Sequence, residues 1–172
     1  MHTTQVKVRF YELDPYDHVN HTKYLAYFEA ARVEYLEELG WGLLSMKERG
    51  LQIVVVELHA RFLAAASLHD VLTVETEVAE IGRATSTWNQ RLVRDGETIA
   101  TLEVKAAFTD RSGRPRRVPA EFAAAVTGSV PDGLSSSDRK RSRISSRRSP
   151  SVTIRIDPGV TGSNRPGLSL PF

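Results

Sequence analysis

One long helical pattern followed by four extended runs is the feature that most limits how this chain can fold. Between residues 22 and 39 the apolar side chains recur at three- and four-residue steps, and Gly40 follows where a glycine commonly ends a helix. The extended runs come next, at residues 53–62, 71–81, 84–94 and 99–109. A single long helix beside several strands predicts a sheet that packs around that helix.

The segments that flank this pattern complete an α+β domain. Residues 5–10 alternate apolar and polar side chains, which predicts a half-buried strand before the helix, with Val6, Val8 and Phe10 on its inner face. A short helical or looped piece is expected at residues 41–50, and a closing helix at 119–126. Asp95-Gly96 is a strong two-residue hairpin signal, so we expect the last two strands to be antiparallel neighbours.

The composition changes at residue 128. Residues 128–172 contain eleven serines, five glycines and five prolines, with eight Lys and Arg against three Asp and Glu. Residues 1–127 therefore hold fifteen basic and eighteen acidic side chains (23 − 8 and 21 − 3), so the basic charge belongs to the tail. We expect one domain at 1–127 and a basic Ser/Arg/Pro/Gly-rich tail at 128–172 that is disordered, because so little apolar surface cannot offset chain entropy.

Composition also excludes several classes of function. The chain has no cysteine, which removes thiolate metal sites and cysteine nucleophiles and fits a reducing cytoplasm. It has no run of eighteen apolar residues and no leader-like N-terminus, so we expect a cytoplasmic protein. Nucleic acid is not expected as a partner, since no aromatic side chain is interleaved with the basic tail.

The junction between the first strand and the long helix carries an unusual density of ionisable groups. The eight residues 14–21 read Asp-Pro-Tyr-Asp-His-Val-Asn-His. They end where the free N–H groups and the positive end of the helix dipole favour negative charge, including that of an oxyanion. A carboxylate beside such amides can act as nucleophile or as general base, so hydrolysis of an ester or thioester is the expected chemistry.

On the residues alone, the cluster is also compatible with helix capping and with metal binding. Asp, Asn and Thr are ordinary helix caps, and Asp-Pro is an ordinary turn. Asp14, Asp17, His18 and His21 are also possible ligands for zinc or iron, although the helical His pair of the familiar zinc motif is missing. The sequence has no Gly-x-Ser-x-Gly, no Gly-x-Gly-x-x-Gly and no P-loop.

A longer stretch around the cluster resembles the signature of a known family. Residues 8–32 read VRFYELDPYDHVNHTKYLAYFEAAR, which contains an Asp, a tight turn, His-Val-Asn and then a Tyr-Leu-x-Tyr-Phe-Glu helix. This run is similar to the signature of the 4-hydroxybenzoyl-CoA thioesterase-like family of hotdog-fold acyl-CoA thioesterases. The segments at residues 61–62, 69–70 and 113–119 resemble later landmarks of the same family.

The resemblance implies a hotdog fold, in which a curved antiparallel sheet wraps one long central helix. It implies a homodimer or homotetramer with active sites at the dimer interface, an acyl-CoA substrate, and no metal or organic cofactor. Asp14 matches the family's catalytic carboxylate, acting as nucleophile or base. The backbone amide of His21 matches the group that polarises the thioester carbonyl.

The resemblance also implies contacts with the rest of the substrate. The expected substrate-binding residues are His18, Asn20, Tyr24, Arg114, Arg116 and Arg117. The three arginines would meet the phosphates of CoA, for which guanidinium groups are well suited. Tyr24, with Tyr27 and Phe28, would line an acyl pocket, although aromatic side chains at helical spacing are more often plain core.

The chain departs from the family in two places. Asp17 stands where the family usually has glycine, and the tail after residue 127 has no counterpart in family members of typical length.

Two other functions fit the same fold. One is an enoyl-CoA hydratase, whose longer Asp-x-Asn-Pro-x-His setting this sequence lacks, and the other is a non-catalytic protein that binds acyl-CoA or acyl-carrier conjugates.

Overall fold

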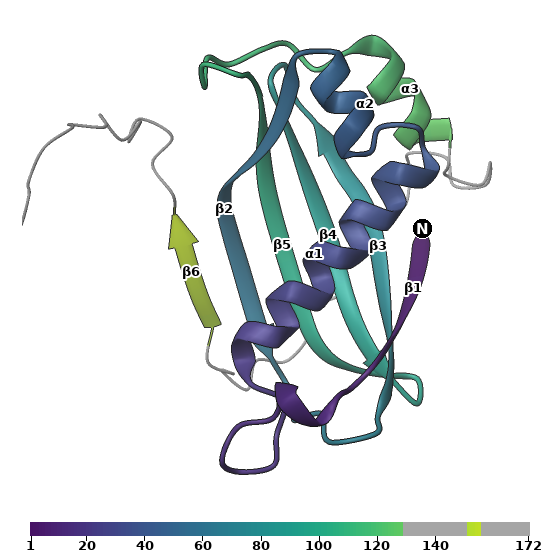
Figure 1. Ribbon diagram of the computed structural model, residues 1–172, viewed down its shortest axis with the longest axis vertical. Coiled ribbons are helices and arrows are strands. Elements are labelled where there is room, and N and C mark those ends of the chain that lie inside the picture. Colours follow the sequence, from purple (N-terminus) through teal and green to yellow (C-terminus); the bar gives the residue numbers. More distant parts are fainter. Residues whose placement is uncertain (129–150, 156–172) are drawn as a thin grey trace, which may run out of the picture.

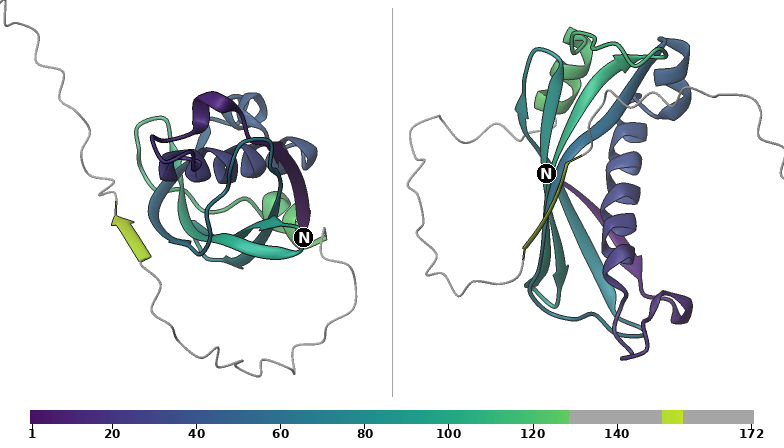
Figure 2. Two further views of the ribbon diagram at one scale, coloured as in Figure 1. Left: turned by 90° about the horizontal axis from the view of Figure 1, so that it is seen from below. Right: turned by 90° about the vertical axis from the view of Figure 1, so that its left-hand side faces the viewer.

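A single antiparallel sheet curves around one long helix, as Figures 1 and 2 show. The computed structural model describes residues 1–128 and 151–155. The strand order across the sheet is β1-β3-β4-β5-β2-β6. The strands are β1 (His2–Lys7), β2 (Leu51–Phe62), β3 (Val71–Ile81), β4 (Thr85–Arg94), β5 (Glu97–Asp110) and β6 (Ser151–Arg155), and the helices are α1 (His21–Glu38), α2 (Leu43–Glu48) and α3 (Ala120–Gly128), with a 3-10 turn at Phe10–Glu12. The predicted hotdog fold is confirmed.

Helix α1 forms where the apolar periodicity predicts it. Asn20 caps its start, because the Asn20 side chain accepts a hydrogen bond from the Thr22 N–H at 3.0 Å. Gly40 follows the helix with a left-handed φ of 73°, which a residue without Cβ adopts at little cost. The buried face of α1 lies against the sheet and consists of Tyr24, Tyr27, Phe28, Ala31 and Tyr35.

The hairpin between β4 and β5 confirms the signal of Asp95-Gly96. Both residues have positive φ, at 50° and 83°, as the two-residue turn that matches strand twist requires. Strand β5 then pairs with β4 on one side and with β2 on the other. Side chains along β5 are buried at alternate positions, among them Leu102, Val104 and Phe108.

Aromatic side chains close the end of the core beneath α2 and α3. Phe122 of α3 meets Phe108 with ring centroids 4.9 Å apart, and it meets Trp41 at 5.3 Å, both edge to face. The guanidinium of Arg49 lies over the outer face of Trp41, 4.0 Å from its centroid. These contacts fix both short helices at the end of the sheet where β5 finishes.

One prediction about the first strand is wrong. Strand β1 ends at Lys7, and Phe10 begins a 3-10 turn in which its side chain is 76% exposed. The Glu12 carboxylate accepts a hydrogen bond from the Arg9 N–H at 2.8 Å, which bends the chain away from the sheet before Phe10. The alternation of Val6 and Val8 therefore does not continue to Phe10.

The tail contributes one strand to the sheet. Strand β6 pairs antiparallel with the outer edge of β2, from Ser151 opposite Arg61 to Arg155 opposite Glu57. Residues 151–155 belong to the segment expected to be disordered, and they form a strand here because β2 offers an open edge. The rest of the predicted disordered tail, at 129–150 and 156–172, lies outside the described residues. No helix within the described residues is both long and apolar enough to span a membrane.

Candidate active site

Asp14 fixes the conformation of the loop between the 3-10 turn and α1 through hydrogen bonds of its backbone and its side chain. The Asp14 N–H donates to the His18 carbonyl at 2.7 Å, and the Asp17 N–H donates to the Asp14 carbonyl at 3.1 Å. The side-chain oxygen Oδ1 accepts from the Tyr16 N–H at 2.8 Å and from the His18 N–H at 3.3 Å. Asp14 is partly exposed, and its second oxygen, Oδ2, accepts no hydrogen bond from the described residues.

Asp17 occupies a left-handed position in the same loop. Its φ is 60°, in the region that glycine adopts freely and that Asp and Asn tolerate better than other residues. The side chain of Asp17 is exposed. Asp17 thus keeps the left-handed backbone of this turn, at the position where the resemblance led us to expect glycine, and adds a carboxylate.

Glu12 and Tyr27 anchor the loop to the helix. Both side chains are buried, at 7% and 5% exposed, and the Tyr27 hydroxyl donates to Glu12 Oε2 at 2.7 Å. Burial raises the pKa of Tyr27, and the hydrogen bond to the Glu12 carboxylate raises it further, so Tyr27 stays protonated. The Glu12 carbonyl also accepts from the Asn20 N–H at 2.9 Å. Sequence reasoning missed this pair, although Glu12 lies only two residues before Asp14.

The first turn of α1 leaves one backbone amide beside the loop, that of His21, without a partner among the described residues. Asn20 Oδ1 accepts from both the N–H and the hydroxyl of Thr22, at 3.0 and 2.8 Å. The N–H of His21, the first residue of the helix, donates to none of the described residues. That amide remains available to an oxygen of a ligand, with the helix dipole behind it. The capping interpretation therefore holds for Asn20, and it leaves the His21 amide unused.

The segment that joins β2 to β3 forms the other wall of the site. The Val19 N–H donates to the Ala66 carbonyl at 2.8 Å, and the backbones of His18 and Ser67 form a bridge. Asp70 fixes this segment, since its carboxylate accepts from the Ser67 N–H at 3.0 Å and from Arg94 at 2.7 Å. Partial burial raises the pKa of Asp70, but the Ser67 amide and the Arg94 guanidinium outweigh it, so the net pKa is lowered.

The structure separates the predicted substrate-binding residues. His18 and Asn20 lie in the Asp14 loop, where the His18 side chain is exposed. Tyr24 is buried, and its hydroxyl accepts from the Ala66 N–H at 2.8 Å, which favours the core interpretation.

Arg114, Arg116 and Arg117 are exposed at the opposite end of the sheet, after β5. Strand β5 begins beside the Asp14 loop, because the Leu63 N–H donates to the Ile99 carbonyl. From Ala100 to Asp110 it then runs about 30 Å at the usual rise per residue. Within one chain, these arginines and Asp14 cannot contact the same small group.

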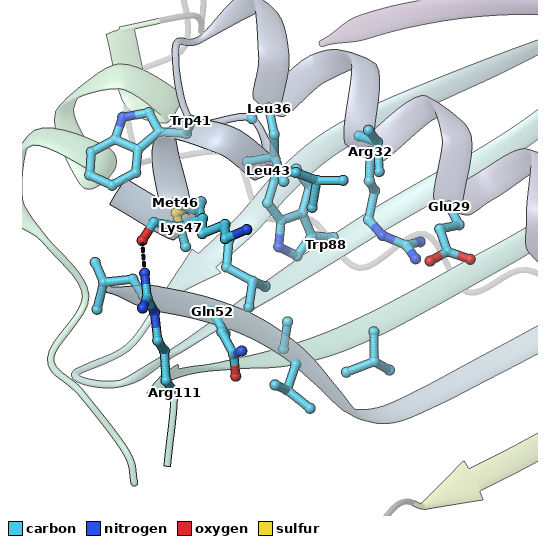
Figure 3. Close-up of a pocket in the computed structure, with 17 residues that line it drawn as sticks. Glu29, Arg32, Leu36, Trp41, Leu43, Met46, Lys47, Gln52, Trp88 and Arg111 are labelled. Carbon is cyan, nitrogen blue, oxygen red and sulfur yellow. Dashed lines mark hydrogen bonds between the residues drawn. The ribbon is translucent and has the colours of Figure 1, made fainter. Parts of the chain in front are cut away.

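A large cavity lies between α1, α2 and the first half of β2 (Figure 3), and Asp14 is not among the residues that line it. Its volume is about 660 Å³, and its walls are mainly apolar. Glu29, Arg32, Lys47 and Arg111 are the charged residues among its walls. No local sequence pattern indicates this cavity, because its walls come from segments far apart in the chain.

Comparisons with known proteins agree with this architecture. A family model described as the thioesterase-like superfamily matches residues 8–126. The acyl-CoA thioesterase YbgC of Haemophilus influenzae is 38% identical over 122 residues, covering 70% of this chain and 90% of the relative. The long-chain acyl-CoA thioesterase FadM of Escherichia coli is 32% identical over 102 residues, covering 56% of this chain and 74% of the relative.

A solved structure shares both fold and sequence with this chain. A thioesterase of Thermus thermophilus in complex with coenzyme A and zinc superposes with a TM-score of 0.66 at 25% identity, covering 74% of this chain and 92% of that one. Among the described residues of the present chain, no three His, Asp or Glu side chains are grouped so as to hold a metal ion. The chain therefore belongs to the thioesterase-like superfamily, and its helix wrapped by an antiparallel sheet is the hotdog fold.

Proposed function

We propose that this protein hydrolyses acyl-CoA thioesters to the free acid and CoA, with Asp14 and the His21 amide as its catalytic groups. One observation carries the proposal: the Asp14 carboxylate has one oxygen fixed by loop amides and the other without a partner among the described residues. It lies in the loop that leads directly into the first turn of α1, where the His21 amide has no partner among the described residues. The similarity to YbgC, which is named as an acyl-CoA thioesterase, supports the substrate class.

The geometry of Asp14 suits either of two roles. As a general base, Oδ2 takes a proton from water, and the resulting hydroxide attacks the thioester carbon. As a nucleophile, Oδ2 attacks that carbon itself and forms a mixed anhydride, which water then cleaves by attack at the acyl carbon. In both cases the carbon–sulfur bond breaks, the thiolate of CoA leaves and takes up a proton, and the acid retains one oxygen from water.

The His21 amide supports the step at which charge develops on the carbonyl oxygen. A fixed N–H donor aimed at an oxyanion is typically worth about 3 kcal/mol, close to a hundredfold in rate. The first-turn amides of α1 need no reorganisation for this role, because Asn20 and the Glu12–Tyr27 pair hold the helix start in place. No side chain of His21 is required.

The phosphates of CoA are bound by a second copy of the chain in this proposal. Arg114, Arg116 and Arg117 lie at the end of β5 that is about 30 Å from the Asp14 loop, so in this proposal they do not bind the phosphates of the substrate held by Asp14 of the same chain. In a homodimer the arginines of one copy can approach the Asp14 loop of the other. The expected assembly is thus a homodimer, or a homotetramer built from dimers, which light scattering on the purified protein would detect.

The test is release of free thiol from a panel of short-chain, long-chain and aromatic acyl-CoAs by the full chain and by Asp14→Asn. Asp17→Asn is the matched control, because it makes the same chemical change three residues away and Asn also tolerates a left-handed backbone. The proposal predicts that the parent and Asp17→Asn release thiol while Asp14→Asn is impaired.

Two results would contradict the proposal. Binding of every acyl-CoA without release of thiol would assign the protein to the non-catalytic class. Addition of water to an enoyl-CoA without release of thiol would assign it to the hydratases.

A further inference from the structure

The outer edge of β2 is covered by a strand that comes from the tail. In the sheet formed by residues 1–128, β2 is the last strand, and β6 pairs with it antiparallel along residues 57–61. Figure 1 shows β6 as the outermost strand, next to β2. Residues 151–155 therefore occupy an edge that would otherwise have no partner strand within the described part of the chain.

The sequence of β2 makes this edge prone to pairing. Its twelve residues, LQIVVVELHARF, include neither proline nor lysine, which commonly protect an exposed edge strand. Glu57 and Arg61 supply its charges, and both lie in the part that β6 covers. The part before Glu57 has no charged residue and contains three consecutive valines, whose branched side chains favour extended pairing. Such an edge is a template for another strand.

Strand β6 covers less than half of this edge. Its five residues pair with residues 57–61, and residues 51–56 have no strand on that side within the described residues. A longer strand would make more ladder hydrogen bonds than β6 makes. Any strand that pairs with more than six consecutive residues of β2 must include residue 57, which β6 occupies. It can therefore add to the sheet only after β6 has left.

A second copy of the chain is the partner that fits this edge. Two β2 strands related by a two-fold axis pair antiparallel, and each offers the same residues to the other. One end of β2 lies at the arginine end of the sheet, since Leu51 is opposite Asp110. The other end lies near the Asp14 loop, since Phe62 is opposite Ala100. Antiparallel pairing therefore brings the arginines of one copy toward Asp14 of the other.

Strand β6 can compete with this partner because it belongs to the same chain. Residues 129–150 join it to the domain, so its effective concentration at the β2 edge is on the order of millimolar. A second copy is present only at its bulk concentration. A strand of five residues can therefore hold the edge against a longer competitor in dilute solution.

We propose that residues 151–155 compete with a second copy of the chain for the edge of β2, so that the tail controls assembly of the dimer. This inference rests on the homodimer of the proposed function, but not on its hydrolytic chemistry. Both copies must release β6 before they pair, so the apparent dissociation constant rises as the inverse square of the uncovered fraction. If β6 is in place about 90% of the time, it weakens the dimer about a hundredfold.

The experiment measures the dissociation constant of the full-length dimer by analytical ultracentrifugation over a range of protein concentrations. One variant carries both Val152→Pro and Thr153→Pro. The N–H groups of adjacent strand residues point to opposite sides, so one of these prolines removes a hydrogen bond to β2, and residues 1–128 stay unchanged. This variant should dimerise at least about tenfold more tightly than the parent.

Two controls accompany this variant. Ser145→Pro with Ser146→Pro adds the same number of prolines to the tail before β6 and should dimerise as the parent does. Asp14→Asn should also match the parent, because the competition does not involve the catalytic carboxylate. Hydrogen exchange in dilute solution gives a second readout. The amides of residues 57–61 that face β6 should exchange faster in the variant with prolines in β6 than in the parent.

Equal dissociation constants for the parent and the variant with prolines in β6 would overturn the proposal, and so would the absence of dimers from both at every concentration. A weaker dimer in that variant would also overturn it, since β6 would then hold two copies together. If no acyl-CoA releases thiol but the prolines still tighten the dimer, the proposed hydrolysis fails and this inference stands.

Discussion

The hydrogen bond between Tyr27 and Glu12 should contribute measurably to stability, because both groups are buried and one is a carboxylate. Hydrogen bonds to charged groups are worth roughly 1.5–3 kcal/mol, so Tyr27→Phe should lower the free energy of unfolding by about 2 kcal/mol. The Arg9 N–H still donates to the same Glu12 oxygen after the substitution, so the carboxylate is not left entirely unpaired. This places the expected loss in the middle of the range.

Glu12→Gln tests whether the negative charge of Glu12 is the reason that the hydrogen bond with Tyr27 stabilises the protein. A glutamine at this position can still accept from the Tyr27 hydroxyl, but a neutral hydrogen bond is only about half as strong as a charge-assisted one. Tyr27→Phe should therefore cost about 1 kcal/mol in the Glu12→Gln background, against about 2 kcal/mol in the parent. The coupling between the two substitutions is then about 1 kcal/mol.

Urea unfolding of the parent, both single variants and the double variant measures this coupling. Tyr16→Phe is the control, since Tyr16 is 80% exposed and its hydroxyl makes no hydrogen bond to the described residues, so no change is expected. If Tyr27→Phe costs the same in both backgrounds, or less than the control, the pair does not anchor the loop through a charge-assisted hydrogen bond.

Three further predictions concern the same end of the molecule. Asp17→Ala should be less stable than Asp17→Gly by about 1 kcal/mol, because a φ of 60° strains any residue with an apolar Cβ, and equal urea midpoints would contradict this. Asn20→Ala should lose about 1 kcal/mol by urea unfolding through loss of the cap, whereas Asn20→Ser should recover most of it, and an Ala variant as stable as the parent would exclude a capping role. The pKa of Asp70 is lowered, so its contribution is present above about pH 4, the ordinary value, and is lost as the pH falls through the lower folded value. Asp70→Asn should therefore be less stable than the parent near neutral pH and should approach it in acid, and a stability difference that is constant from pH 7 to pH 2 would contradict the assignment.

The sequence predicted those elements of the fold whose conformation depends on residues close together in the chain. The apolar steps of α1, its glycine at position 40 and the Asp95-Gly96 turn each depend on a few neighbouring residues, and the structure confirms all three. Phe10 was placed on the wrong face because the bend depends on Glu12 reaching back to the Arg9 amide. A pattern of alternating residues contains no information about that hydrogen bond.

The remaining features depend on contacts between distant segments. Arg32 and Gln90 are 58 residues apart, and their contact exists only because α1 packs on β4. Strand β6 depends on the open edge of β2, which is visible only when the order of strands is known. The position of Arg114, Arg116 and Arg117 also depends on the order and direction of the strands. Because β5 runs away from the Asp14 loop, these arginines lie far from Asp14.

The turnover number of Asp14→Asn at saturating acyl-CoA tests the central claim most directly, when it is measured beside the affinity of the same variant for a non-hydrolysable thioether analogue. A positioned acid–base group contributes about a hundredfold or more, so turnover should fall at least that far while the affinity for the analogue stays unchanged. Turnover equal to that of the parent would show that the Asp14 carboxylate takes no part in the reaction.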